Sequence, residues 1–412
     1  MNRQINPSTG NATVKGGGPV VLQVVPRLIA GGAERGAVDI AAALVAARGT
    51  AIVASEGGPM ERELKRAGAV HVTLPLSSKN PWVMYRNVER LAALVRKYGV
   101  DLIHARSRAP AWSAAAAARR AGCRFVTTFH GAYRFGSEIK RRYNAIMVAG
   151  DRVIANSEFI ARHIRENYKV DPARIRLIRR GVDLGLFDTE RVSAERMIQL
   201  ATRWRLPDGV PVVILPGRLT RLKGQPLLID ALAELGDLPF RCLLVGSDFG
   251  RAAYRAELER QAARRGLSDR VHLPGQCDDM PAAYMLADVA VCASTTPEAF
   301  GRVIAEAQAM GCPVVASAHG GAREQVLEGR TAFLFEPGNA HALAAAIRHA
   351  LELDAAARER LSREARAHAR ANFSRDQMCA ATLAVYREIL RAAEAEASAA
   401  PGGRAAPSGT AV

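Results

Sequence analysis

Short runs of β-branched and other apolar residues alternate with helix-length amphipathic segments along most of the chain. Segments with apolar residues three or four apart, such as Ala33–Ala47 and Trp82–Lys97, separate most of these runs in the first half. The runs there are Val20–Val25, Thr50–Ala54, Val70–Leu74, Asp101–His104, Phe125–Phe129, Val153–Ala155 and Ile175–Ile178. Continuous apolar runs of this length between helices are typical of strands buried in a parallel sheet. The first half therefore predicts a doubly wound α/β domain.

The same alternation restarts after an irregular, mostly polar segment over Gly185–Asp208. The later runs are Val210–Leu215, Phe240–Val245, Val271–Leu273, Val289–Cys292 and Val314–Ala316, and a last helical pattern covers Gln377–Arg391. We expect two α/β, Rossmann-like domains facing a cleft, over residues 19–190 and 191–373, and a last helix over 374–395. The Gly-, Pro-, Ser- and Ala-rich ends, 1–18 and 396–412, are expected to be disordered tails.

Positive charge is concentrated in the first half. The formal net charge is +17, and residues 1–190 hold 30 Lys and Arg against 15 Asp and Glu, whereas residues 191–412 hold 27 against 25. Such a surplus attracts nucleic acid, anionic lipid or acidic glycans, although an arginine-rich composition without a partner is also open. The chain has no zinc-finger spacing, stacking motif or basic heptad helix, so nucleic acid is not an expected partner.

Cysteine spacing and hydropathy narrow the class of protein further. No uninterrupted apolar stretch of 18 residues occurs, so a membrane-spanning helix is not expected. The six cysteines are scattered singly, without disulfide or metal-ligand spacing. We interpret them as reduced core residues of a cytosolic protein without a metal site.

A cationic, glycine-rich loop follows Val210–Leu215. It is Pro216-Gly217-Arg218-Leu219-Thr220-Arg221-Leu222-Lys223-Gly224, and a helical pattern comes next. Glycine lets the backbone approach a ligand closely, and Arg218 and Lys223 put two cations beside a helix N-terminus. The loop indicates a phosphate site, although an ordinary turn with solvated charges can have the same composition.

Two glutamates eight residues apart follow the run Val289–Cys292. Glu298 lies in the loop, and Glu306 lies about two turns into a helix expected to begin near Gly301. Carboxylates accept hydrogen bonds from hydroxyls, and the N–H groups of a helix start can face an anion. This spacing alone is weak evidence. It gains weight because the pair lies between a strand and Met310-Gly311-Cys312-Pro313-Val314-Val315.

With these two loops the chain resembles the retaining glycosyltransferases of the fourth sequence family, which have the GT-B two-domain architecture. The agreeing segments elsewhere are Gly31-Gly32-Ala33-Glu34-Arg35, Ala155-Asn156-Ser157-Glu158, Gly181-Val182-Asp183 with Phe187, Val245-Gly246 and Gly320-Gly321-Ala322-Arg323-Glu324. The resemblance covers roughly residues 19–393, and it implies that the helix over 374–395 crosses back to the first domain. Its visible departure is Arg179-Arg180, where many relatives have Pro-Asn before Gly-Val-Asp.

The resemblance implies a role for each matching residue. Arg218 and Lys223 would bind the donor diphosphate, Glu298 would contact hydroxyls of the transferred sugar, and Glu306 would contact the ribose. The implied catalytic set is His130, Arg218, Lys223 and Glu298, and the remaining donor-binding positions are Gly32, Gly217, Gly246, Phe300, Gly301, Arg302 and Val303. His130 would face the reacting sugar, with a structural histidine as the alternative. Gly31, His104 and Arg106 would line the acceptor side.

The implied reaction is the retaining, metal-independent transfer of a hexosyl unit from a nucleotide-diphosphate sugar. UDP-hexose and GDP-mannose are the expected donors, and no tightly bound cofactor is expected. The sequence has no Asp-x-Asp metal motif, so fixed cations would stabilise the charge on the departing diphosphate.

The acceptor is less constrained than the donor. The basic first domain, with Lys140-Arg141-Arg142 beside Tyr143, favours peripheral binding to the anionic inner face of the cytoplasmic membrane. A cell-envelope glycan or glycolipid such as lipopolysaccharide core would then be the acceptor. The alternatives are a soluble transferase acting on a small sugar or sugar phosphate, and a phosphorylase- or epimerase-like enzyme of the same architecture. Glu298 and Glu306 argue against an epimerase.

Overall fold

The computed structural model describes residues 17–29, 31–133 and 135–399 and contains two parallel sheets. The first sheet has the order β3-β2-β1-β4-β5-β6-β7. Its strands are β1 (Val20–Val24), β2 (Thr50–Ser55), β3 (Val70–Thr73), β4 (Leu102–Ala105), β5 (Arg124–Phe129), β6 (Arg152–Ala155) and β7 (Ile175–Leu177). Its central strands β1 and β4 are buried along their whole length, as expected for a parallel sheet covered on both faces.

The second sheet has the order β10-β9-β8-β11-β12-β13, and its paired strands are parallel. Its strands are β8 (Val212–Pro216), β9 (Arg241–Val245), β10 (Val271–Gly275), β11 (Val289–Cys292), β12 (Val314–Ser317) and β13 (Phe333–Phe335). Alternate residues face two different hydrophobic clusters: Ile214 packs into one, and Val213 and Leu215 pack into the other. This period of two shows that both faces of the sheet are buried.

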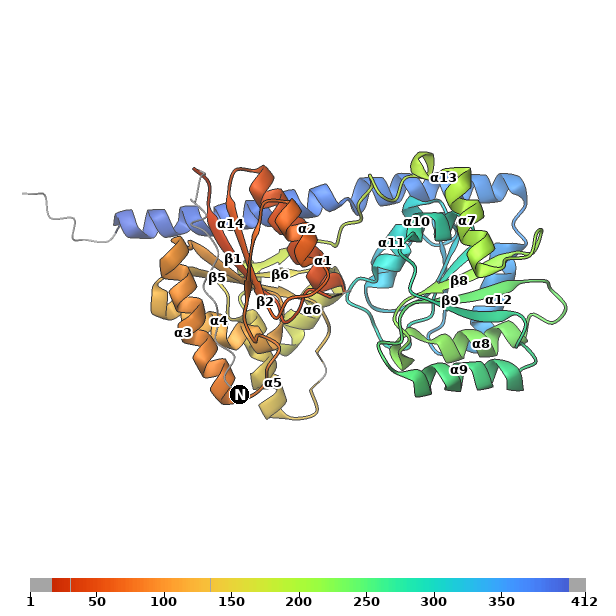
Figure 1. Cartoon of the computed structure of the whole chain (residues 1–412), viewed down its shortest axis with the longest axis horizontal. Coiled ribbons are helices and arrows are strands. Elements are labelled where there is room, and N and C mark those ends of the chain that lie inside the picture. The colour runs from red at the N-terminus through yellow and green to blue at the C-terminus, as the bar shows by residue number, and fades with distance from the viewer. Residues whose placement is uncertain (1–16, 30, 134, 400–412) are drawn as a thin grey trace, which may run out of the picture. The chain divides into compact units, whose positions relative to one another are not determined.

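Helices flank both sheets (Figure 1). They are α1 (Gly32–Ala46), α2 (Glu61–Arg66), α3 (Pro81–Tyr98), α4 (Arg108–Ala121), α5 (Glu138–Asn144), α6 (Glu158–Asn167), α7 (Ala194–Trp204), α8 (Gln225–Ala233), α9 (Ala252–Arg264), α10 (Met280–Met285), α11 (Arg302–Ala309), α12 (Ala340–Leu351), α13 (Ala355–Asn372) and α14 (Arg375–Ala399). Among the described residues, no helix combines the length and the apolar character needed to cross a bilayer.

The chain divides into two compact units. One contains the residues up to Phe129, Phe135–Val153 and the chain from Thr382 on, and the other contains His130–Arg134 and Ile154–Ala381. The α/β class with two doubly wound parallel sheets is confirmed, and the later part of α14 belongs to the unit that holds β1–β5. The domain boundaries proposed at residues 190 and 373 stay predictions.

Two elements differ from the sequence-based expectation. The segment over Gly185–Asp208 is not irregular throughout, because it contains α7. Ser193 Oγ accepts a hydrogen bond from the Arg196 N–H at 3.3 Å, and Leu200 and Trp204 bury one face of the helix. The second sheet also has a short strand, β13, after the last one that the sequence indicated. Three residues are too few to display a period of two.

The predicted tails fall largely outside the described residues. The N-terminal tail, 1–18, is described only at its last two positions, and β1 begins at Val20. The predicted helix over 374–395 extends beyond its expected end, because α14 continues to Ala399. The rest of the predicted C-terminal tail lies outside the described residues.

A buried polar contact joins α14 to the first sheet within one compact unit. The hydroxyl of Tyr386 lies 2.6 Å from His104 Nδ1, and His104 Nε2 lies 2.7 Å from Thr128 Oγ1. Tyr386 and His104 are both fully buried. Because buried polar groups lose their bonds to water, the contact of Tyr386 with His104 stabilises the packing of α14, and Thr128 holds the histidine ring in place.

Tyr386→Phe should therefore destabilise the protein although the aromatic ring stays in place. Losing the hydroxyl leaves His104 Nδ1 without this contact in a buried position, which costs about 1–2 kcal/mol of unfolding free energy. Tyr98→Phe is the control, because Tyr98 is only partly buried on α3. Equal unfolding midpoints in denaturant for the two variants would contradict a stabilising role for this contact.

Candidate functional site

The second sheet changes direction between β8 and β11. The chain proceeds from β8 outward to β9 and β10, and then returns to the other side of β8 as β11. In open parallel sheets, ligands bind beside the carboxyl ends of the strands at such a switch point. The loops after β8 and β11, which carry Arg218, Lys223 and Glu298, flank this point. The topology therefore brings together residues about 75 positions apart.

An ion pair joins the two loops. Lys223 Nζ donates hydrogen bonds to Glu298 Oε1 at 2.8 Å and to Oε2 at 2.9 Å. Both side chains are partly buried, with 21% and 26% of their surface exposed. Burial opposes the charged form of each group, but the partner charge outweighs it. The pKa of Lys223 is raised and that of Glu298 is lowered, so both remain charged near neutral pH.

Two residues to which the sequence assigned no role complete the surroundings of Glu298. Ser294 Oγ donates a short hydrogen bond to Glu298 Oε1, and His319 Nε2 lies 2.7 Å from the Ser294 carbonyl oxygen. His319 also helps to lower the pKa of Glu298. His319 follows β12, which neighbours β11. Its place directly before Gly320-Gly321, at the same sheet edge, is the signal that could have identified it.

Glycines hold these loops at distances that a side chain would prevent. Gly224 has φ +73°, and a Cβ there would lie 1.8 Å from the Ala293 carbonyl oxygen. A Cβ at Gly246, where φ is +158°, would lie 2.0 Å from the Gly217 carbonyl oxygen. Both positions therefore require glycine to keep the loops after β8, β9 and β11 in contact.

The loop that carries Glu298 is fixed from the β12 side as well. The Gly321 N–H donates to the Glu298 carbonyl oxygen at 2.9 Å, and a Cβ at Gly320 would lie 2.5 Å from the same oxygen. Phe300 is buried against Phe373, with ring centroids 5.5 Å apart. These contacts fix the backbone between Glu298 and Gly301, where α11 begins.

Glu306 lies inside α11 rather than in the loop. Its Oε2 accepts a hydrogen bond from the buried Tyr284 hydroxyl at 3.2 Å, and Arg302 Nε lies 3.5 Å from its Oε1. Gly301 caps the helix with φ +81°, and Val303 follows Arg302 in its first turn. The helix was expected to begin near Gly301, and the structure places its first residue at Arg302.

Arg218 is an exposed cation of the β8 loop. Its side chain has no hydrogen bond or ion pair among the residues that the structure describes, while its carbonyl oxygen accepts from Gln225 Nε2 at 3.0 Å. Lys223, in contrast, is bound to the Glu298 carboxylate, which a ligand of Lys223 would have to displace. An anionic ligand at this loop would meet the Arg218 guanidinium directly and would compete with a carboxylate for Lys223.

His130 is paired with the second residue of the Arg179-Arg180 departure. Arg180 Nη2 lies 2.8 Å from His130 Nδ1, and Arg180 is buried. A guanidinium has no acceptor atom, so Nδ1 must accept this hydrogen bond and a neutral His130 carries its proton on Nε2. Arg179 lies 3.9 Å from Glu324, whose carboxylate accepts from the N–H groups of Glu158 and Phe159.

The residues predicted for the acceptor side lie in the other compact unit. Gly31 caps α1 and Gly32 is its first residue. Arg106 is buried and donates from Nε to Gln23 Oε1 at 2.8 Å. Both ring nitrogens of His104 have hydrogen-bond partners, Tyr386 and Thr128, which explains how this polar side chain can be buried in the core. Acceptor contacts for these positions stay predictions.

Acidic, histidine and cysteine side chains do not gather in the described part of the chain in groups of three or more suited to a metal ion. The six cysteines are unpaired thiols, four of them buried. Burial raises the pKa of the Cys292 thiol to about 11. Cys292 is therefore neutral in the wall beneath Glu298, and metal independence stays a prediction.

Two family models match separate halves of the chain. Residues 199–368 match the model described as glycosyl transferases group 1, and residues 30–186 match glycosyltransferase family 4. The crystal structure of a glycosyltransferase from Rickettsia africae ESF-5 is similar at 36% identity with a TM-score of 0.85, and the alignment covers 91% of this chain and 99% of that one.

Two further relatives carry more specific names. Anabaena Alr3699/HepE in complex with UDP-glucose is 28% identical with a TM-score of 0.78, over 89% of this chain and 99% of that one. A D-inositol 3-phosphate glycosyltransferase from Xylanimonas cellulosilytica is 36% identical over 250 residues. That match covers 60% of this chain and 59% of the relative, so the chain spans less than two thirds of that protein.

Gly224→Ala should destabilise the second unit far more than Gly236→Ala. Both glycines have a positive φ, but a Cβ at Gly236 meets nothing within 4 Å. Gly236→Ala should cost about 1 kcal/mol of unfolding free energy from backbone strain alone. Gly224→Ala adds a clash with Ala293 and should cost about 2–3 kcal/mol more. Equal losses in chemical denaturation would contradict the close contact between the β8 and β11 loops.

Proposed function

Because the chain belongs to the group 1 glycosyltransferases, we propose that it moves a hexosyl unit from a UDP-sugar to a hydroxyl of a small phosphorylated sugar or polyol. The observation that carries the donor half of this proposal is the contact between Lys223 and Glu298 at the switch point of the second sheet, with the Arg218 charge near enough to act on Lys223. The UDP-glucose complex of the Anabaena relative supports a uridine donor.

Donor binding would rearrange the ion pair rather than fill an empty site. A diphosphate carries more charge than one carboxylate, so it would draw the Lys223 ammonium from Glu298 while Arg218 binds a second phosphate oxygen. The released Glu298 carboxylate would then accept hydrogen bonds from hydroxyls of the sugar. In this scheme the pair keeps both groups charged until the ligand replaces one partner. The ribose would lie toward Glu306.

The chemical step breaks the bond between the sugar anomeric carbon and the diphosphate oxygen. Negative charge grows on the departing phosphate, and Arg218, Lys223 and the amides from Phe300 to Val303 would stabilise it. The acceptor hydroxyl oxygen bonds to the anomeric carbon on the face from which the diphosphate leaves, so the configuration is retained. The hydroxyl proton passes to the leaving phosphate. His130, protonated on Nε2, would donate a hydrogen bond to the reacting sugar.

The acceptor half of the proposal is supported by the relatives named D-inositol 3-phosphate glycosyltransferase. Their name describes a polyol phosphate as acceptor, which fits the small-acceptor alternative better than a lipopolysaccharide core. A phosphorylated acceptor also suits the charge distribution, because residues 1–190 carry twice as many basic as acidic residues.

Lys223→Ala should abolish transfer, whereas Arg221→Ala should keep most of it. Both changes remove one cation from the same loop, but Arg221 points to Glu257 at 2.7 Å and stacks over Tyr254. UDP binding should weaken by about a hundredfold in Lys223→Ala, the effect of losing a charge-assisted bond and leaving Glu298 unpaired. Calorimetry with UDP measures it.

The identity of the acceptor is tested with the wild-type protein. Release of UDP from UDP-glucose should rise with inositol phosphate or a hexose phosphate as acceptor and not with the unphosphorylated sugars. Turnover that requires a glycolipid instead would reject the small acceptor while leaving the donor assignment intact.

A second candidate, a cell-envelope glycolipid acceptor reached from the inner face of the cytoplasmic membrane, is favoured by one surface of the first unit. On α3, Trp82 and Tyr85 are 65% and 61% exposed and stack with centroids 6.0 Å apart. On α5, Ile139 is 81% exposed and Lys140 is its exposed neighbour. We call these residues, with Trp112, the aromatic patch.

The residues of the aromatic patch lie on α3, α4 and α5, three helices of the same unit (Figure 1). Ser113 Oγ donates to the Met84 carbonyl oxygen at 2.8 Å, which links α4 to α3. Trp112 stacks on Tyr143 with centroids 6.1 Å apart, which links α4 to α5. Exposed Trp and Tyr rings prefer the lipid headgroup region, and each basic residue adds about 1 kcal/mol at an anionic surface.

Trp82→Ala/Tyr85→Ala should reduce flotation of the protein with vesicles of phosphatidylcholine and phosphatidylglycerol. Ile198→Ala/Met285→Ala is the control, because both residues are exposed apolar side chains of the other unit. Little of either variant should float with vesicles of phosphatidylcholine alone, because these vesicles have no negative surface charge to attract the basic residues. If the wild type does not float with anionic vesicles at low salt, membrane association is rejected.

A further inference from the structure

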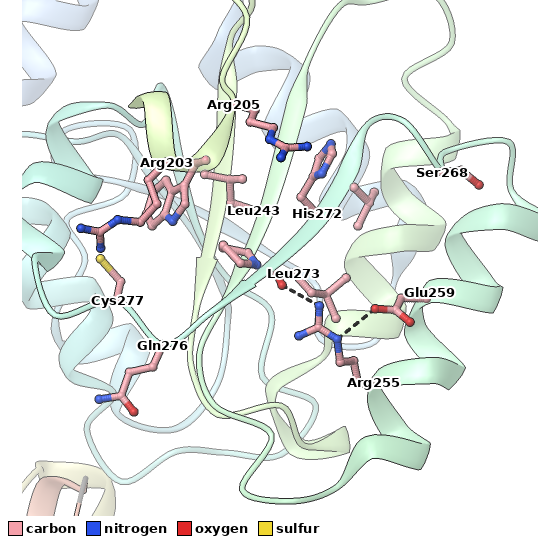
Figure 2. A pocket seen from close by; sticks show the side chains of 13 residues that line it. Arg203, Arg205, Leu243, Arg255, Glu259, Ser268, His272, Leu273, Gln276 and Cys277 are labelled. Carbon is pink, nitrogen blue, oxygen red and sulfur yellow. Dashed lines mark hydrogen bonds and ion pairs between the residues drawn. The ribbon is translucent and has the colours of Figure 1, made fainter. Parts of the chain in front are cut away.

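Polar side chains converge at the end of β11 but not in the hollow beside β10. Figure 2 shows that hollow, in which the side chains of Arg203 and Arg205 point to opposite sides. These two cations therefore do not meet at one point. At the end of β11, by contrast, the Ser294 hydroxyl and the Lys223 ammonium both donate to the carboxylate of Glu298. The partners of this carboxylate indicate which way it faces when a ligand binds.

The two carboxylate oxygens of Glu298 have different partners. Oε1 accepts a hydrogen bond from Lys223 Nζ at 2.8 Å and a short one from Ser294 Oγ. Oε2 accepts from Lys223 Nζ at 2.9 Å and has no other hydrogen-bond partner in the part of the chain that the structure describes. Removal of the ammonium would therefore leave Oε1 bonded to the protein and Oε2 open to a ligand.

The peptide unit that follows Ser294 is held at both of its polar ends. His319 Nε2 lies 2.7 Å from the Ser294 carbonyl oxygen, and because a carbonyl only accepts, Nε2 carries a proton and donates it. The Thr295 N–H donates to the Leu222 carbonyl oxygen at 3.0 Å. Ser294 is also buried, with 3% of its surface exposed. These contacts fix the plane of the peptide, so a rigid backbone presents the Ser294 hydroxyl to Glu298.

The Glu298 carboxylate has little space in which to turn. The cavity that it lines together with Ser294, Ser317 and His319 has a volume of about 10 Å³, and a single water molecule already needs about 10–15 Å³. Burial opposes ionisation of Glu298, but Lys223, with smaller contributions from Ser294 and His319, lowers its pKa. Glu298 is therefore an ionised group that has little room for a second orientation.

We propose that Ser294 is a positioning residue for the Glu298 carboxylate and that His319 holds Ser294 in place. This inference rests on the proposed function, in which the donor diphosphate draws Lys223 away from Glu298. Ser294 then keeps Oε1, and Oε2 faces the hydroxyls of the transferred sugar. A carboxylate held at one oxygen accepts from a hydroxyl in a fixed direction, so the pair Ser294 and His319 favours sugars that have a hydroxyl at that place.

The affinities for UDP and for UDP-glucose, measured by calorimetry on the full chain, separate this role from a merely structural one. UDP has no sugar to contact Glu298. Ser294→Ala should therefore keep the affinity for UDP within about twofold and weaken that for UDP-glucose by about tenfold, the effect of losing a hydrogen bond to a charged group. Retained UDP binding also shows that the variant is folded. Ser362→Ala is the control, because that hydroxyl donates to the Gly311 carbonyl oxygen at 2.6 Å, and it should change neither affinity.

The part of His319 is tested by a conservative replacement. Glutamine can place an amide N–H close to the position of the histidine Nε2 and can donate to the Ser294 carbonyl oxygen. His319→Gln should therefore keep the wild-type ratio of the two affinities. His319→Ala should weaken binding of UDP-glucose and leave binding of UDP unchanged, as Ser294→Ala does.

The outcomes distinguish this inference from the proposed function. Equal weakening of UDP and UDP-glucose in Ser294→Ala would make Ser294 a structural residue of the loop and overturn the inference, and so would two unchanged affinities. If UDP binding is lost in Lys223→Ala while Ser294→Ala has no effect, the donor site stands and the positioning role alone is rejected. Wild-type protein that binds neither nucleotide would overturn both.

Discussion

The ion pair between Lys223 and Glu298 is the interaction on which the candidate site depends. Each charge alone would be costly in a partly buried position, and together they are neutral. Because the pair spans the β8 and β11 loops, it needs the parallel sheet to place those strands side by side. In the proposed function, the pair would also make the site selective for ligands with more negative charge than a carboxylate, since a weaker anion would not draw Lys223 away.

The backbone around this pair explains why so many glycines surround it. Gly224 contacts the carbonyl of Ala293, which precedes Glu298 in the β11 loop. Gly320 and Gly321 contact Glu298 and its chain neighbours from the β12 side. The loop that carries the carboxylate is thus enclosed by close backbone contacts on two sides. Side chains hold the charges, but these contacts decide how precisely the charges meet.

The sequence predicted the two sheets and the loops of the switch point, because continuous apolar runs and glycine-rich loops are local signals. It did not predict α7, whose buried Leu200 and Trp204 stand among charged residues, or the role of His319, which depends on the adjacency of β12 and β11. His104 is a further example. Its contacts in the structure are with Thr128 and with Tyr386, 282 positions away, and no local sequence pattern predicts contacts at that separation.

Charge counts and charge pairing give different information about this chain. The surplus of basic residues in 1–190 produces a long-range positive field, which favours acidic partners but does not show where a ligand binds. The nearly neutral second half contains both a paired cation, Lys223, and an exposed one, Arg218, whose side chain has no ion pair among the described residues. Only the fold distinguishes them, because compensation depends on which carboxylate the topology brings within reach. The contact between Lys223 and Glu298 at the switch point is therefore stronger evidence for a ligand site than the excess of positive charge in the first half.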